Sequence, residues 1–155
     1  MQKNLPDCPK PIFSDNWKIT GCPVNGPRAD ALGNNLAVAW FTAPGKNQQV
    51  NIVFSTDGGA TFSPPIRMDE GKGIGRVDVI VLDEESAMVS WMEGSVIKAA
   101  KVHHDGKKEP SFVIGSSSEG RSSGFPQMTR SGNRVIFAWT DDHDKTIKTS
   151  ELSIK

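Results

Sequence analysis

A tryptophan that ends a short apolar stretch recurs three times, and this repeat constrains the fold more than any other feature. The stretches Leu36–Trp40, Ala87–Trp91 and Val135–Trp139 each end in this residue, and the tryptophans are 51 and 48 residues apart. Short apolar runs bounded by turn residues are typical of buried strands. A period of about fifty residues is typical of repeat arrays, propellers among them. The sequence therefore predicts three copies of one β-unit.

Further strand-like stretches surround each tryptophan strand in the same order. Extended stretches precede it at residues 28–32, 79–82 and 127–130. Third strands follow it at 50–55, 96–102 and 146–152, and candidate fourth strands lie at 66–69 and 111–115. Thirteen positions before the tryptophans lie Pro27, Asp78 and Pro126, which we expect to be equivalent. With 15 glycines, 10 prolines and no helical periodicity, the chain is predicted to be all-β.

The predicted units are antiparallel four-stranded blades at residues 26–69 and 75–115, followed by an incomplete blade at 124–155. Residues 1–11 are an N-terminal extension. The stretch 12–20 lies directly before the first unit, where the fourth strand of a preceding blade would be. We therefore expect it to act as a closing fourth strand.

The stretch Ser-Thr-Asp-Gly-Gly-Ala-Thr-Phe at residues 55–62 lies between two extended runs. Glycine accepts a positive φ without steric cost, so Asp-Gly-Gly predicts a hairpin here. The side chains of Ser55 and Asp57 can bond the turn's own backbone N–H groups, and Phe62 can fold back under the turn. A decayed copy is predicted at His103–Glu109, which keeps only the aspartate and one glycine.

This stretch resembles the Asp-box, or bacterial neuraminidase repeat, of sialidase-type β-propellers. The fixed positions of that motif are matched by Ser55, Asp57, Gly59, Thr61 and Phe62. In that family the box is a folding device between the third and fourth strands of a blade. The stretches 22–27, 37–42, 75–78 and 89–91 are also similar to the C-terminal half of bacterial exo-α-sialidase-like proteins.

The resemblance implies half of a six-bladed sialidase-like propeller. An open arc of three blades would leave two sheet faces and two strand edges uncovered. We therefore expect either a missing N-terminal half or a homodimer closed by strand exchange, in which strand 12–20 pairs with strand 146–152 of the other copy. The family favours a periplasmic or extracellular protein, although the N-terminus carries no apolar signal segment.

In the resembling fold, the loops from strand four to strand one and from strand two to strand three form the ligand face. The expected ligand-binding residues on that face are Asn25, Arg28, Arg76, Asp78, Glu93, Arg121 and Asp142. Arginine beside carboxylates on a concave face suits an anionic sugar, because guanidinium binds carboxylate in bidentate fashion. The alternative is ordinary solvated loop charge.

Ligand recognition, with a carbohydrate or another anionic small ligand, is the function that we predict. One alternative is a glycoside hydrolase whose site is completed by a second half, and another is a structural or protein-interaction propeller. The family's mechanism uses a tyrosine nucleophile paired with Glu. This chain has no tyrosine, so no catalytic residue is assigned.

The balance of 18 basic and 18 acidic residues argues against partners that need a basic face, such as nucleic acid or a membrane surface. No metal and no cofactor is predicted. Asp141–Asp144 lacks the spacing and glycine of a calcium loop, and Gly71–Gly75 precedes a strand rather than a phosphate-binding helix. Cys8 and Cys22 can either form a bridge or remain two free thiols.

Overall fold

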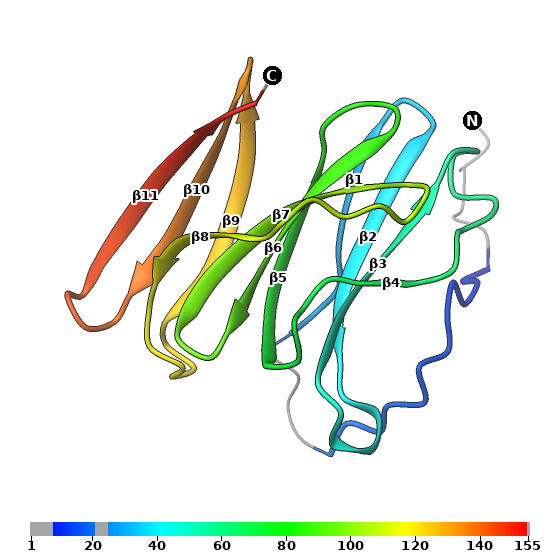
Figure 1. Ribbon diagram of the computed structural model, residues 1–155. Coiled ribbons are helices and arrows are strands. Elements are labelled where there is room, and N and C mark those ends of the chain that lie inside the picture. The colour runs from blue at the N-terminus through cyan, green and yellow to red at the C-terminus, as the bar shows by residue number, and fades with distance from the viewer. Residues whose placement is uncertain (1–7, 21–24, 155) are drawn as a thin grey trace, which may run out of the picture.

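The computed structural model describes residues 8–20 and 25–154 and confirms the all-β class (Figure 1). Its strands form three antiparallel sheets of four, four and three strands. The first sheet comprises β1 (Arg28–Leu32), β2 (Asn35–Thr42), β3 (Gln49–Ser55) and β4 (Ile66–Arg67). The second comprises β5 (Gly73–Val81), β6 (Ser86–Glu93), β7 (Val96–His103) and β8 (Phe112–Ser116). The third comprises β9 (Gly124–Ser131), β10 (Arg134–Asp141) and β11 (Thr146–Ser153), and a 3-10 turn, η1 (Pro44–Lys46), precedes β3.

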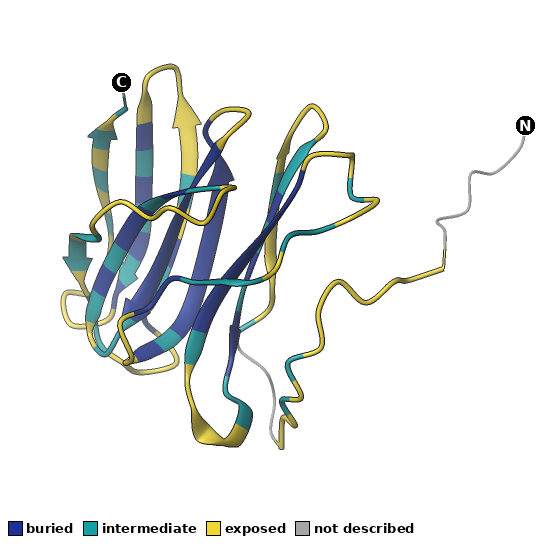
Figure 2. Cartoon of the chain, turned by 45° about the vertical axis from the view of Figure 1, so that its right-hand side comes forward, coloured by how far each residue is buried: buried dark blue, intermediate teal, exposed yellow. Residues whose placement is uncertain are grey.

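The sheets stack face to face in chain order, with the second sheet in the middle (Figures 1 and 2). One apolar core lies between the first two sheets and includes Phe41, Ile52 and Val89. Another lies between the second and third sheets and includes Met92 and Phe137. In the second sheet β5, β6 and β7 are therefore largely buried on both faces, although the edge strand β8 is partly exposed. The first and third sheets each keep one open face. No helix among the described residues is long and apolar enough to cross a membrane.

The tryptophans of the second and third sheets point toward the preceding sheet. Trp91, on β6, belongs to the core shared with the first sheet, and Trp139, on β10, belongs to the core shared with the second. Successive side chains of a strand alternate between faces. Because Ala39 and Phe41 lie in the first core, Trp40 between them points to the outer face of the first sheet.

The hairpin that joins the first two strands is longer in the second sheet than in the others. The closing pairs are Leu32 with Asn35 and Ser131 with Arg134, but Val81 with Ala87 in the second sheet. In each sheet, one residue of the first strand pairs with the residue that precedes the tryptophan. These equivalent first-strand residues are Arg28, Asp78 and Gln127. The predicted equivalence of Pro27, Asp78 and Pro126 was wrong by one residue in two units, because equal hairpin lengths had been assumed.

Two predicted loops are partly strand. The sequence predicted no strand between residues 69 and 79 or between residues 115 and 127, yet β5 begins at Gly73 and β9 at Gly124. Near the start of each strand, an irregularity in the pairing holds two successive residues at positive φ. The glycines of the two pairs, Gly75 and Gly124, have φ values of 92° and 80°. A Cβ on Gly75 would lie 2.6 Å from the Asn25 side chain, so glycine is required for close approach as well as for φ.

Residues 12–20, predicted as a fourth strand, form no strand in the single chain. They lie outside the first sheet (Figure 2), where the Phe13 ring is 5.9 Å from that of Trp40 and the Trp17 ring is 5.5 Å from that of Phe41. The predicted pairing strand, β11, lies at the opposite end of the stack (Figure 1). Residues 12–20 therefore cannot pair with β11 of the same chain.

Cys8 is an exposed free thiol. Cys22 lies outside the described residues, so the predicted choice between a bridge and two thiols is untested.

Candidate functional site

A groove lies where the first strands of the three sheets run side by side. It consists of two adjoining hollows of about 270 and 390 Å³, both of which are lined by Gln127. Of the predicted ligand-binding residues, Asn25, Arg28 and Arg76 line the smaller hollow and Asp78 lines the larger. The structure thus brings four of the seven predicted residues to one groove.

Asn25 holds the first strands together rather than facing a ligand. Its Nδ2 donates to the carbonyl of Ile74 at 3.1 Å, and its Oδ1 accepts from the backbone N–H of Arg76 at 2.7 Å. The side-chain amide therefore replaces the regular strand pairing that the bulge at Gly75 disrupts.

Arg76 is buried, and its guanidinium is used by the fold. Its Nη1 donates to the carbonyl of Ser118 at 3.2 Å, and its Nη2 donates to the carbonyls of Glu119 and Gly120 at 2.8 and 2.5 Å. It also lies 4.9 Å from the centre of the Phe125 ring. Burial lowers the pKa of Arg76, although the Glu119 charge acts against this. The residue fastens the β8–β9 loop to β5 and has little capacity left for a ligand.

Arg28 and Asp78 form a contrasting pair in this groove. Arg28 is exposed, and it makes no ion pair or side-chain hydrogen bond with the described part of the chain. Asp78 is buried, and its Oδ2 accepts from the backbone N–H of Met128 at 2.6 Å. Burial, helped by the Asp30 charge, raises the pKa of Asp78 despite that hydrogen bond and the charge of Arg28. The groove therefore combines a free cation with a carboxyl group whose ionised form is disfavoured.

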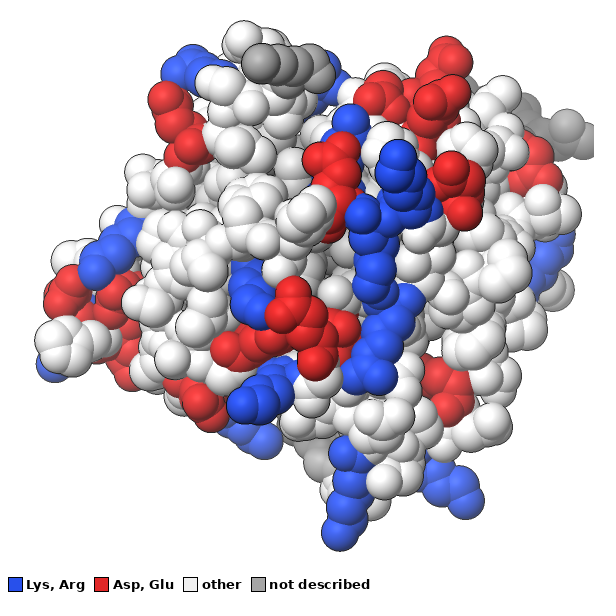
Figure 3. All heavy atoms as spheres, in the orientation of Figure 1, with Lys and Arg blue, Asp and Glu red and all other residues white. Residues whose placement is uncertain are grey.

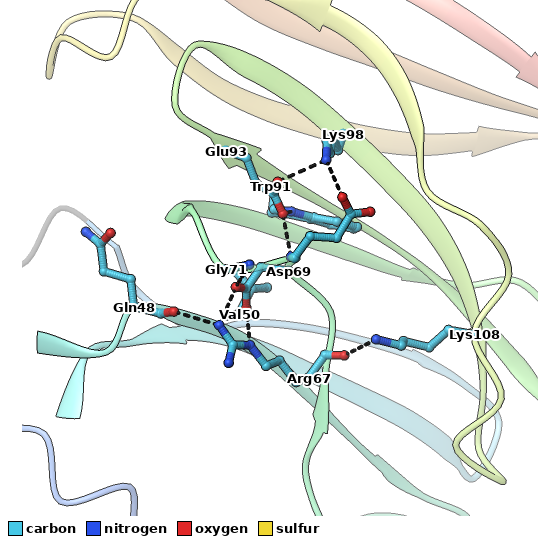
Figure 4. Close-up of polar contacts among 10 residues, drawn as sticks. Gln48, Val50, Arg67, Asp69, Gly71, Trp91, Glu93, Lys98 and Lys108 are labelled. Carbon is cyan, nitrogen blue, oxygen red and sulfur yellow. Dashed lines mark hydrogen bonds and ion pairs between the residues drawn. The ribbon is translucent and has the colours of Figure 1, made fainter. Parts of the chain in front are cut away.

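Glu93 lies apart from the groove, in a clasp that we define as Glu70, Trp91, Glu93 and Lys98 (Figure 4). Its carboxylate accepts from the backbone N–H of Glu70 at 2.7 Å, from Trp91 Nε1 at 3.0 Å and from Lys98 Nζ at 2.9 Å. Burial alone would raise the pKa of Glu93, but these donors lower it overall. The clasp ties the β4–β5 loop to β6 and β7, so Glu93 has a structural role in this chain.

Asp69, next to the clasp, has a similar role that the sequence did not reveal. The buried carboxylate accepts from the backbone N–H groups of Val50 and Gly71, at 2.6 and 2.9 Å, and from the Arg67 guanidinium (Figure 4). Burial opposes ionisation, yet these donors lower the pKa of Asp69 below its usual value. Only the local spacing Arg67-x-Asp69 could have indicated the pair.

Arg121 and Asp142 are exposed and lie on neighbouring loops, because Ser122 donates to Asp142 Oδ2 at 3.0 Å. They do not line the groove's two hollows. The acidic turn beside them is organised by Asp141, whose Oδ1 accepts from the backbone N–H groups of His143 and Asp144. Lys148 lies 2.7 Å from Asp141 Oδ2 and lowers its pKa. In the described residues no cluster of three potential metal-ligating side chains occurs.

The turn at residues 55–62 lies at the end of the strands opposite to the smaller hollow. Ser55 Oγ accepts from the backbone N–H of Gly59 at 2.9 Å, as the sequence predicted for its side chain. Asp57 accepts from the backbone N–H and the hydroxyl of Thr61 at 2.9 and 2.6 Å, and these bonds lower its pKa to about 2. The Phe62 ring approaches Gly59 from beneath the turn. The connection between β3 and β4 spans residues 56–65, so it is longer than the tight hairpin expected from Asp-Gly-Gly.

The groove also contains residues that the sequence analysis missed. Gln127 is exposed at the position equivalent to Arg28 and Asp78. Asp30 lines the larger hollow, and its Oδ2 accepts from the backbone N–H of Val81 at 2.7 Å, which joins β1 to β5. Counting from the tryptophan with a variable hairpin length would have identified Gln127, whereas no local signal indicated the role of Asp30.

Acidic and basic side chains are interspersed on the face shown in Figure 3, which agrees with the zero net charge of the chain. The chain matches no model of a known protein family and no curated protein.

Proposed function

We propose that the three sheets are successive blades of a sialidase-like β-propeller and that the chain is a ligand-recognition module. The ligand is a carbohydrate or another small molecule that carries a carboxylate, and it binds in the groove at the first strands. The observation that carries this proposal is the exposed guanidinium of Arg28, which makes no ion pair with residues 8–20 and 25–154, beside the buried carboxyl group of Asp78.

A carboxylate suits this groove for two reasons. Guanidinium presents parallel N–H donors that match the two oxygens of a carboxylate. The raised pKa of Asp78 reduces the repulsion that a second carboxylate would experience there, and a protonated Asp78 can donate a hydrogen bond. The exposed amide of Gln127 offers both a donor and an acceptor to sugar hydroxyl groups.

The proposal does not include catalysis by this chain alone. The groove residues offer no tyrosine nucleophile, because the chain contains no tyrosine. Support for the propeller comes from the shared direction of the three tryptophans and from the hydrogen-bonded turn at residues 55–62.

The test is ligand-observed NMR of the full chain with sialic acid, glucuronic acid and their uncharged parent sugars. We expect saturation transfer to the acidic sugars, a weaker signal at the neutral ones and loss of the signal in Arg28→Met. Lys107→Met is the matched control, because it removes one positive charge from the β7–β8 turn, at the other end of the strands. Equal signals from Arg28→Met and the wild type would reject the site, and no signal from any of these sugars would favour a structural or protein-interaction role.

A further inference from the structure

We propose that a second copy of this chain docks on the outer face of the first sheet, and that residues 12–20 add to the third sheet of that copy as its fourth strand. The same exchange occurs twice about a twofold axis. This interaction surface is independent of the groove and of the proposed ligand.

The third sheet offers a strand edge whose register can be deduced from the other two. The residues opposite the tryptophans are Asn51, Lys98 and Lys148. In the first two sheets these positions are already paired on their other side, Asn51 with Arg67 and Lys98 with Val113. Within the described residues, β11 pairs only with β10, so the edge at Lys148 and Thr149 is open.

The occupied edges share a sequence pattern that recurs in residues 12–20. The triplets Ile66-Arg67-Met68 and Phe112-Val113-Ile114 each place their first and third side chains in the core shared with the next sheet. Trp17-Lys18-Ile19 has the same apolar-x-apolar order. It also precedes Arg28 by 11 residues, much as Ile66 precedes the equivalent Asp78 by 12. The segment therefore matches a fourth strand that precedes the first sheet.

The first part of the segment already lies beside the face that this arrangement requires. Asp15 Oδ2 accepts from Trp40 Nε1 at 3.2 Å, and Phe13 lies against the Trp40 ring. Trp40 points to the open face of the first sheet, so the segment lies beside the face on which the second copy would pack. Phe13 and Ile19 are 46% and 47% exposed in the single chain, whereas Trp17 packs against the first core beside Phe41 and would have to move to enter the new interface.

The two open faces correspond to faces that already pack within the chain. Trp91 packs against the face of the first sheet that carries Ala37 and Ala39, and Trp139 packs against the face of the second that carries Met88 and Met92. The equivalent positions of the third sheet are Ile136, Ala138 and Thr140, on its open face. This face also carries Ile147, which is 69% exposed. It would receive Trp40 of the second copy as the other two faces receive their tryptophans.

The charges at the open edge are compatible with the predicted register, in which Lys18 lies opposite Lys148. The Lys148 ammonium lies 2.7 Å from Asp141 and 2.5 Å from Asp144. The two carboxylates outnumber the lysine, so a second lysine arriving there meets a net negative edge. A single chain cannot make this pairing, because β11 and residues 12–20 lie at opposite ends of the stack (Figure 1).

The register can be tested by a cross-link in the full chain, with Cys8 and Cys22 replaced by serine. Directly opposed residues of antiparallel strands lie within disulfide reach. We expect Lys18→Cys combined with Lys148→Cys to give a covalent dimer under mild oxidation. Lys18→Cys combined with Glu151→Cys is the matched control, because a shift of three residues moves the second thiol by about 10 Å. Equal cross-linking of both pairs, or a disulfide within one chain, would overturn the exchange.

The association itself is tested by light scattering of the wild-type chain at micromolar concentration. We expect twice the mass of one chain. Ala138→Arg places a charge on the face that receives Trp40 and is expected to raise the dimer dissociation constant about a hundredfold. Val113→Arg is the control, because Val113 is 64% exposed on β8, an edge strand of the middle sheet that takes no part in the proposed contact. Circular dichroism establishes that both variants fold. A wild-type monomer, or a dimer that Ala138→Arg leaves intact, would refute the proposal.

Discussion

Arg76 and Arg28 line the same hollow, yet one arginine belongs to the fold and the other is free. Arg76 is buried and donates to three carbonyls of the β8–β9 loop. Arg28, at the start of β1, is exposed and has no acidic partner in the described residues. The contrast teaches that residue type and loop position do not identify a ligand-binding arginine. What matters is whether the backbone has already used its donors.

Replacing Arg76 is expected to have the largest effect on stability. Arg76→Met removes three hydrogen bonds from a charged donor to the β8–β9 loop, and each such bond contributes about 1.5–3 kcal/mol. We expect the free energy of unfolding to fall by about 3 kcal/mol or more in urea denaturation. Arg76→Lys retains the charge but cannot reach all three carbonyls. Its free energy of unfolding should therefore lie between those of the wild type and Arg76→Met. A fully stable Arg76→Met protein would show that the loop is held by other contacts.

Glu93→Gln tests the second predicted ligand-binding residue that the fold uses. The amide keeps the shape of the side chain but weakens the bond from Lys98 and turns one acceptor into a donor. We expect a loss of about 1–2 kcal/mol in thermal or chemical unfolding. Glu109→Gln is the control, since its contact with Lys101 is exposed and 3.8 Å long and should contribute little. If the two variants were equally stable, the clasp would not support the fold.

Asp57 contributes a pH-dependent effect. Its folded pKa of about 2 lies below the ordinary value of 3.8. Its contribution is therefore present above the unfolded pKa and is lost as pH falls from about 3.8 through about 2. We expect Asp57→Asn to lower the melting temperature by a few degrees at neutral pH. In acid, the melting temperatures of the variant and the wild type should become more similar. Asp105→Asn is the control in the second turn, and a difference between wild type and Asp57→Asn that does not change with pH would contradict the assignment.

Arg28→Met is expected to have the smallest effect on stability, because the side chain is exposed and unpaired. We expect the free energy of unfolding to change by no more than about 0.5 kcal/mol. Affinity for an acidic sugar should nevertheless fall by about tenfold or more, since a charged hydrogen bond is worth about 1.5–3 kcal/mol. A large loss of stability would place Arg28 with Arg76, among the arginines that hold the fold.

The sequence alone predicted most strands, because the residue patterns that indicate a strand are local. Apolar runs bounded by glycine, asparagine and proline located the strands around each tryptophan, and the last unit was correctly expected to have three strands. The oxygen-rich side chains of Ser55 and Asp57 were also sufficient to predict bonds to their own turn. Local hydrogen bonds of this kind depend on spacing along the chain rather than on distant partners.

The candidate site was predictable only as a set of loops. Arg28 and Asp78 reach one groove, but Glu93 is held in the clasp and Arg121 and Asp142 lie on other loops. The first hairpin of the second sheet is longer than those of the other two sheets. Counting the same number of residues back from each tryptophan therefore did not identify Gln127 as equivalent to Asp78. The pairing of residues 12–20 with residues 146–152 of a second copy stays a prediction, because a single chain holds the two segments at opposite ends of the stack.

The sequence by itself determined the all-β class, the repeat and the self-contained turn at residues 55–62, because strand periodicity and turn bonds are encoded within a few residues. Only the tertiary structure decided which charges remain available. The guanidinium of Arg76 is used because distant carbonyls are brought within 3.2 Å of it. Arg28 remains exposed, and the described part of the chain brings no such partner to it.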